Sequence, residues 1–180
     1  MNKIPLQQLD GCINTASGRK INLLDPKPEQ ISIGDIARGL SYNSHFGGQT
    51  PQFFSISQHC LLVCELMELR FKKDPAMMML ALLHDASEAY LGDMLKPLKV
   101  MLPNFREIED RMMGVILERY SLDPTSMVII KEYDILAQEM EYNAFYKNGE
   151  IKYLSPEESR LAFLKSYYRY MNQRHITFTL

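Results

Sequence analysis

The sequence has no tryptophan, only three cysteines, no long apolar run and no large excess of either charge. Its 20 basic and 22 acidic residues are mixed along the chain, so no polybasic surface predicts binding to a nucleic acid polymer. No stretch has the apolar length that crosses a bilayer, and residues 1–10 lack the apolar core of a signal peptide. We therefore expect a cytoplasmic protein with neither a membrane nor a nucleic acid polymer as partner.

The small number of cysteines fits that compartment. Cys60 and Cys64 stand one helical turn apart in an apolar segment, where buried thiols are expected rather than metal ligands or a bridge. A chain of 180 residues, 46% of them hydrophobic, is long enough for one buried core and short for two. We expect a single domain over residues 1–180.

Helical patterns follow one another along most of the chain. Each begins at a capping side chain, at a proline in the first turn, or at a run of apolar residues spaced three and four apart. The predicted helices start at Ser32, Ser55, Asp74, Asn104, Met127 and Ser155, and the third runs without a break over residues 74–91. No segment predicts a sheet, so the expected fold is all-α, a compact bundle of five or six main helices.

The segment LALLHDASEAYLGD, residues 80–93, places four ionisable residues at the end of an apolar helix: His84, Asp85, Glu88 and Asp93. On a continuous helix His84 and Glu88 share a face, with Asp85 about 100° round. An ionisable group at the end of a buried helix is costly unless it is paired or binds a metal. Imidazole and carboxylate together suit divalent ions such as Mn, Fe, Co, Ni and Zn, so the segment predicts part of a metal site.

One His-Asp pair does not complete a coordination shell, and the chain offers two further ligands on other helices. His59 begins an apolar helical stretch, and Asp134 lies inside another. Taken alone, His59 is explained as a hydrogen-bonded core histidine and Asp134 as a helix-surface acid. Both are unusual placements for surface residues, and we interpret them as ligands. His175, near the end of the chain, is assigned to solvent.

The order His59, His84-Asp85, Asp134 on a helical chain resembles the H…HD…D signature of the HD-domain metal phosphohydrolases. HDASEAYLGD followed by KPLK is similar to the small bacterial 5′-deoxynucleotidases. GRKINLLDP, DIARGLS and FFSISQHC resemble a phage and bacterial branch that includes phage dATP triphosphohydrolases. The resemblance covers roughly residues 17–145.

The resemblance implies that four residues hold one divalent ion, Co, Mn, Zn, Fe or Mg: His59, His84, Asp85 and Asp134. Such an ion lowers the pKa of a bound water and polarises a phosphoryl group. Glu88 would orient or deprotonate the water, and Asp93 would donate a proton or contact the sugar. Lys96 and Lys99 would offset phosphate charge. The structural alternatives are solvated acids, exposed lysines and, for Asp93, a cap on the following turn.

The turn HFGGQT departs from the family pattern. An arginine and an aromatic residue usually precede the first ligand, and here His45 and Phe46 stand there. His45 lacks the bidentate guanidinium, although it donates to phosphate when protonated. Gln49 stands where relatives often have histidine. We expect His45, Phe46 and Gln49 to contact substrate, with the small glycines letting a base or sugar approach, and a simply packed turn as the alternative.

The function implied by the resemblance is metal-dependent hydrolysis of deoxynucleotides, with water attacking the α-phosphate of a dNMP or dNTP. A purine dNTP triphosphohydrolase that releases tripolyphosphate is the close alternative. Further alternatives are a non-catalytic nucleotide-binding module, an alarmone hydrolase and a cyclic-dinucleotide phosphodiesterase. Because such proteins assemble as dimers or larger rings, we expect a homo-oligomer in a bacterial or phage-infected cytosol.

Overall fold

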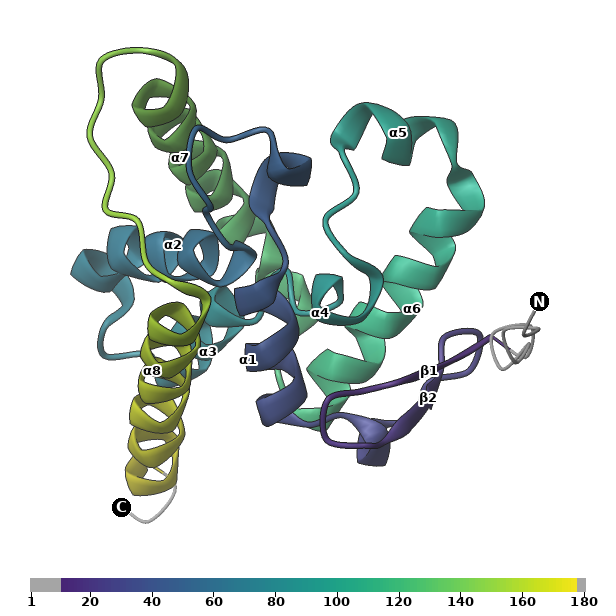
Figure 1. Ribbon diagram of the computed structural model, residues 1–180. Coiled ribbons are helices and arrows are strands. Elements are labelled where there is room, and N and C mark those ends of the chain that lie inside the picture. Colours follow the sequence, from purple (N-terminus) through teal and green to yellow (C-terminus); the bar gives the residue numbers. More distant parts are fainter. Residues whose placement is uncertain (1–10, 178–180) are drawn as a thin grey trace, which may run out of the picture.

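The computed structural model describes the backbone of residues 11–177 and the side chains of residues 11–174, so the side chain of His175 lies outside the described part. Helices dominate it (Figure 1). The elements are β1 (Cys12–Asn14), β2 (Lys20–Asn22), η1 (Pro28–Gln30), α1 (Ile33–Tyr42), η2 (His45–Gly48), α2 (Ile56–Phe71), α3 (Pro75–Leu82), α4 (Glu88–Leu91), α5 (Lys96–Met101), α6 (Pro103–Arg119), η3 (Pro124–Ser126), α7 (Met127–Tyr146) and α8 (Pro156–Thr177).

The all-α expectation is confirmed. Six of the helices in the described range have eight or more residues, which agrees with a bundle of five or six main helices. The prediction that the chain has no sheet is wrong in detail, because β1 and β2, of three residues each, pair as a small antiparallel hairpin. That hairpin is too short to carry the fold, and Ile21 attaches it to the helical core.

The buried helix α3 lies at the centre of the packing. It contacts α2, α7 and α8, and its residues from Met78 to Leu82 are buried. This follows from the segment MMMLALL, which is apolar on every side and therefore has no face that prefers water. A helix surrounded in this way provides a rigid support for the residues that follow it.

Helix starts follow the predicted capping chemistry at three places. Asp74 accepts a hydrogen bond from the Met77 N–H, and Ser55 accepts one from the Gln58 N–H. Ser155 accepts from the Glu158 N–H and donates to the Glu158 carboxylate. These contacts satisfy N–H groups that the first helical turn leaves without partners.

The helix start at Ser32 is predicted from a capping-box spacing, with Asp35 three residues later, and that capping box is not formed. The Ser32 side chain makes no capping hydrogen bond at the start of α1. Asp35, its expected partner, instead accepts hydrogen bonds from the hydroxyls of Thr15 and Ser17 and from the Ser17 N–H. The hairpin loop therefore recruits the acid that the local pattern assigns to the helix start.

Cys60 and Cys64 are buried free thiols, as predicted. Burial raises the pKa of each thiol to about 12. A thiol in that state is neutral at physiological pH and is a poor metal ligand, since the thiolate is the form that binds metal.

The predicted continuous helix over residues 74–91 is interrupted. Helix α3 ends at Leu82, residues 83–87 form tight turns, and α4 begins at Glu88. The His84 ring supplies a physical reason: its Nδ1 lies 2.8 Å from the Ala81 carbonyl oxygen, which an unbroken helix would offer to the Asp85 N–H. The assumption that His84 and Glu88 share one helical face is therefore wrong.

Helix α4 is held in place by close contact with α1. Gly39 packs directly on the backbone of Ala89, and a Cβ at position 39 would overlap that backbone. Asn43 also donates from its amide to the Glu88 carbonyl oxygen at 3.2 Å. The glycine thus permits the approach that fixes the position of Glu88.

Candidate metal centre

His59 lies in the first turn of α2 and is completely buried. Its Nδ1 is 2.8 Å from Glu141 Oε1, and its Nε2 is 3.1 Å from Asp134 Oδ1 and 3.7 Å from Asp85 Oδ2. Ionised carboxylates only accept hydrogen bonds, so this imidazole carries a proton on both nitrogens here. A metal ion bound at Nε2 would replace one of those protons.

His84 and Asp85 stand in the turns after α3, where the bond to Ala81 fixes the orientation of the imidazole. A carbonyl oxygen only accepts, so His84 Nδ1 carries the donated proton and Nε2 faces the site. That Nε2 lies 3.2 Å from Asp85 Oδ2 and 4.0 Å from Asp134 Oδ1, yet it is buried without a hydrogen-bond partner. A buried ring nitrogen without a hydrogen-bond partner, beside two carboxylates, is a position at which a metal ion could replace a proton.

Asp134 reaches the same place from the middle of α7. Gln138, one turn later, donates to its Oδ1 at 2.7 Å, and the Lys131 ammonium contacts Oδ2. The four predicted ligands therefore come from α2, the turn after α3 and α7, and Asp134 Oδ1 lies 3.1 Å from His59 Nε2 and 4.0 Å from His84 Nε2. The ligand atoms of His59, His84 and Asp85 lie within 4.8 Å of one another, close enough for a single ion. Two imidazoles and two carboxylates form a donor set that suits a divalent cation.

The carboxylates and imidazoles of this cluster stabilise one another's charged forms. Burial opposes ionisation of Asp85 and Asp134, but the neighbouring imidazoles outweigh it and hold the pKa of each carboxyl well below its usual range. For His59 and His84 burial favours the neutral ring, but the carboxylates around them raise the pKa of both histidines well above 6.5. Protons on the imidazoles thus balance the carboxylates in the positions where metal charge would do so.

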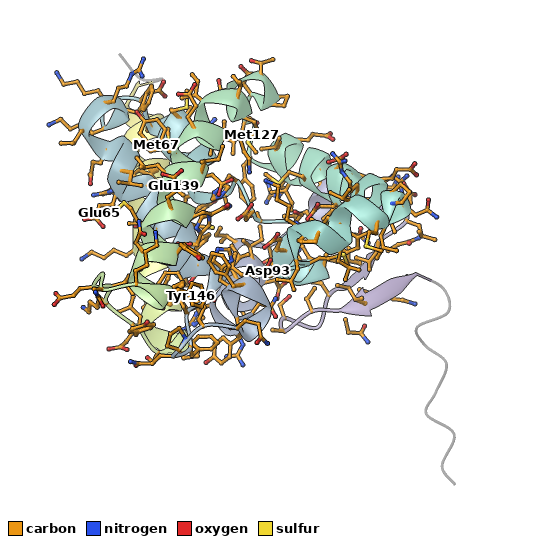
Figure 2. The ribbon with its side chains drawn as sticks, turned by 90° about the horizontal axis from the view of Figure 1, so that it is seen from above. Glu65, Met67, Asp93, Met127, Glu139 and Tyr146 are labelled. Atoms are coloured by element: carbon orange, nitrogen blue, oxygen red, sulfur yellow. The ribbon has the colours of Figure 1, made fainter. Side chains whose placement is uncertain are left out.

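A cavity of about 410 Å³ opens beside these residues, between α7 and the segment that contains α5 and α6. Figure 2 places Asp93 at the junction of these two parts. The lining residues include acids and bases on both walls: Asp85, Glu88, Asp93, Lys96, Lys99, Arg106, Glu109, Asp110, Lys131 and Asp134. Of the four ligands, Asp85 and Asp134 face this cavity, so the ligand cluster is open to it on one side.

Glu88 is buried on the cavity wall, with 5% of its surface exposed. Lys99 donates to its Oε1 at 2.8 Å, and Glu109 shares the same ammonium at 2.7 Å. The second oxygen, Oε2, has no hydrogen-bond partner. Burial and the nearby charge of Asp85 raise the pKa of Glu88 to about 8 in spite of Lys99, so this carboxyl exchanges a proton near neutral pH.

Asp93 is tied to the turn η2 rather than exposed to solvent. Its Oδ2 accepts the Gly47 N–H at 3.2 Å and lies 3.3 Å from His45 Nδ1. A Cβ on Gly47 would come within 3.2 Å of the Leu95 side chain, and its φ is +58°. The small residue therefore serves the close approach of the loop before α5.

The remaining predicted substrate contacts are divided. His45, Phe46, Lys96 and Lys99 line the cavity, but Gln49 is not among its lining residues. The Gln49 carbonyl oxygen accepts a hydrogen bond from the Tyr146 hydroxyl instead. Phe46 has a φ of +53°, a conformation that costs a non-glycine residue about 1 kcal/mol. Its ring packs edge-on against Phe145.

The sequence patterns did not predict Glu141, a fully buried residue that contacts both His59 and His45. They also missed Arg106 and Lys131 in the cavity wall. A signal for Glu141 was present: it follows Asp134 by seven residues, two helical turns, and therefore shares its face of α7.

Comparison with known proteins finds two uncharacterized relatives. The protein named "Uncharacterized protein YfdR" from Escherichia coli strain K12 is 35% identical over 124 residues, which is 69% of this chain and 66% of that protein. "Uncharacterized protein RCAP_rcc00048" from Rhodobacter capsulatus is 39% identical over 113 residues, 59% of this chain and 56% of that protein. The chain thus spans just under two thirds of the first relative and over half of the second. No protein-family model matches the chain.

Among the residues that the structure describes, no helix has the length and apolar character needed to cross a membrane.

Proposed function

We propose that the protein is a metal-dependent phosphohydrolase of deoxynucleotides, of the HD-domain type that its sequence resembles. The observation that carries the proposal is that three of the four expected ligands lie close enough to hold one ion, with Asp134 next to both histidines, beside one cavity that Glu88 also lines. A cavity of about 410 Å³ lies within the range of small-molecule sites, and deoxynucleotides carry the phosphate charge that its basic residues suit.

His59, His84, Asp85 and Asp134 would hold one divalent ion. When bound, such an ion would lower the pKa of a water and polarise a phosphoryl group. The ring orientation of His84 is fixed in advance by the Ala81 carbonyl, so that its Nε2 is presented to the site.

Glu88 would be the proton-transfer residue. Its buried Oε2 has no partner and is free to take a proton from an attacking water, while Lys99 fixes Oε1. Lys99 is shared between Glu88 and Glu109, so we assign it to orienting Glu88 first and to phosphate second. Lys96, Arg106 and Lys131 line the outer cavity and would contact phosphate oxygens.

These three bases also favour the second candidate, hydrolysis of a dNTP with release of tripolyphosphate. A triphosphate brings more negative charge than a monophosphate, and Lys96 and Arg106, together with Lys131 beside Asp134, can offset it. The two candidates share the ligands and Glu88 and differ in which phosphates the outer bases contact.

The deciding experiment is hydrolysis of the four dNMPs and four dNTPs with Mn²⁺ or Co²⁺, with EDTA as control, resolving phosphate from tripolyphosphate. Phosphate from dNMPs alone supports a 5′-deoxynucleotidase, and tripolyphosphate from dATP or dGTP supports the second candidate. Asp85→Ala should abolish both reactions, whereas Glu132→Gln, at an exposed acid two residues from Asp134, should leave them unchanged. Product from metal-stripped Asp85→Ala at the wild-type rate contradicts the site assignment, and no product from any of the eight substrates contradicts the proposed activity.

A further inference from the structure

We propose that Glu141 is a positioning residue, whose two carboxylate oxygens orient the ligand His59 and the substrate-side residue His45 at the same time. This inference rests on the proposed metal site. It adds to that site a residue that neither the sequence resemblance nor the comparison with relatives assigns.

The placement of Glu141 supports a role beyond packing. Its side chain is fully buried in α7, two turns after Asp134 on the same face. Its Oε1 lies 2.8 Å from His59 Nδ1, and its Oε2 lies 3.3 Å from His45 Nε2. A buried carboxylate loses its hydration, so an acid at this depth needs partners of this kind. Here both partners are imidazoles that face the candidate site.

The contact with His59 determines which ring nitrogen faces the ligand cluster. With a proton held on Nδ1 by Glu141, the lone pair for a metal is on Nε2, which already points at Asp134 and Asp85. Metal-binding histidines commonly donate their second N–H to a carboxylate or carbonyl in this way. His84 has the carbonyl version, through Ala81, and Glu141 supplies the carboxylate version for His59.

The contact with His45 extends the arrangement to the cavity. His45 lies between two acids, with Nδ1 3.3 Å from Asp93 and Nε2 3.3 Å from Glu141, although neither contact has hydrogen-bond alignment. Its ring centroid is 4.6 Å from that of His59. Glu141 therefore connects α7 with α2 and η2, and Asp93, which also accepts the Gly47 N–H, connects η2 with the loop before α5. His45 lines the cavity, so loss of its contact with Glu141 would change its position relative to the metal ligands.

The test uses the Zn²⁺-loaded full-length protein with ¹⁵N-labelled histidine. Long-range proton–nitrogen correlation spectra distinguish protonated, bare and metal-bound ring nitrogens. The chain has only four histidines, so single His→Gln variants assign the signals. In the wild type we expect a slowly exchanging proton on His59 Nδ1 and metal on Nε2. Glu141→Gln should speed solvent exchange of the Nδ1 proton, because a neutral amide oxygen is a weaker acceptor than a carboxylate, and should weaken Zn²⁺ binding by about 10- to 100-fold. Glu132→Gln, on the exposed face of α7, should change neither by more than about twofold.

Glu141→Asp guards against misfolding of the glutamine variant. It keeps the charge but withdraws the oxygens by one methylene, so we expect an intermediate Zn²⁺ affinity. A purely structural role predicts instead that both variants lose helical content in parallel with metal affinity.

Four further results would overturn the inference, and they separate it from the proposed function. If Glu141→Gln matches Glu132→Gln in spectrum and affinity, or if Zn²⁺ occupies His59 Nδ1, the positioning role fails while the metal site stands. If the wild type binds two Zn²⁺ ions per chain and Glu141→Gln binds one, Glu141 is a metal ligand and not a positioning residue. His45, His59 and Glu141 are themselves close enough to hold an ion. If the wild type binds no Zn²⁺, Mn²⁺ or Co²⁺, the proposed metal site fails and the inference falls with it.

Discussion

Replacing Glu88 with glutamine should stabilise the metal-free protein at alkaline pH while abolishing hydrolysis. The carboxyl is buried, its Oε2 has no partner, and its pKa is raised from 4.5 to about 8. Because protonation is easier in the folded protein than in the unfolded chain, protonated Glu88 favours the fold. That contribution is complete below about pH 4.5 and is lost as the pH rises through about 8.

The size of the effect follows from the same two values. The interval between 4.5 and about 8 corresponds to about 5 kcal/mol when fully expressed. Between pH 5 and pH 9 the wild type should lose about 4 kcal/mol of unfolding free energy relative to Glu88→Gln. A glutamine keeps the shape and has no charge to bury, so the variant should lack this part of the pH dependence.

Urea unfolding in EDTA, followed by the helical circular dichroism signal, measures the difference at pH 5 and pH 9. Other groups titrate in both proteins and cancel in the comparison. Glu109→Gln is the matched control, because it removes the negative charge of the other acid bonded to Lys99 and leaves the Glu88 carboxylate intact. A gap between Glu88→Gln and wild type that stays constant within about 1 kcal/mol from pH 5 to pH 9 refutes the reasoning.

Three further outcomes are expected. Asp85→Asn should weaken Mn²⁺ or Co²⁺ binding at least tenfold, because it removes a ligand charge next to His59 and His84, and calorimetry would detect an unchanged affinity as a contradiction. The affinity of the wild type for the same ions should fall as the pH is lowered towards 6, with proton release in buffers of different ionisation enthalpy, since the pKa values of both histidines are raised; a pH-independent affinity would exclude that competition. Gly39→Ala should lower the unfolding free energy by about 1 to 3 kcal/mol, since the new methyl overlaps the Ala89 backbone, and a neutral effect in thermal unfolding would mean that α1 and α4 pack less closely than described.

The sequence predicted the parts of the fold that local physics controls. A helix that is apolar on all sides had to be buried, and Asp74 with Pro75 had to start it. The pattern did not predict where that helix ends, because the end depends on a side chain, His84, that competes for the Ala81 carbonyl. The capping box at Ser32 failed for a similar reason, since Asp35 is claimed by a loop distant in sequence.

The candidate site was predictable as far as residue type and order reach. His59, His84, Asp85 and Asp134 were chosen from their placement in apolar segments and from their family order, and the structure brings them together. Glu141 was missed because an acid within a mixed helix looks ordinary until its partners are known. Gln49 stays a prediction without a place in the cavity, because a turn with positive φ angles at Phe46, Gly47 and Gly48 sets side-chain directions that sequence spacing does not reveal.

The two walls of the cavity differ in how firmly they are attached to the rest of the protein. His84 is bonded to the end of α3, which is buried beneath α2, α7 and α8, so freeing that ring would require disruption of the central core. The opposite wall includes α5, which has no buried residue and leaves Met101 75% exposed. The amide protons of α3 should therefore exchange only through global unfolding, while those of α5 should exchange through local openings of low free energy. The ligand geometry would then survive local fluctuations of α5, and a substrate that enters past Lys96 and Lys99 would leave the metal-binding groups undisturbed.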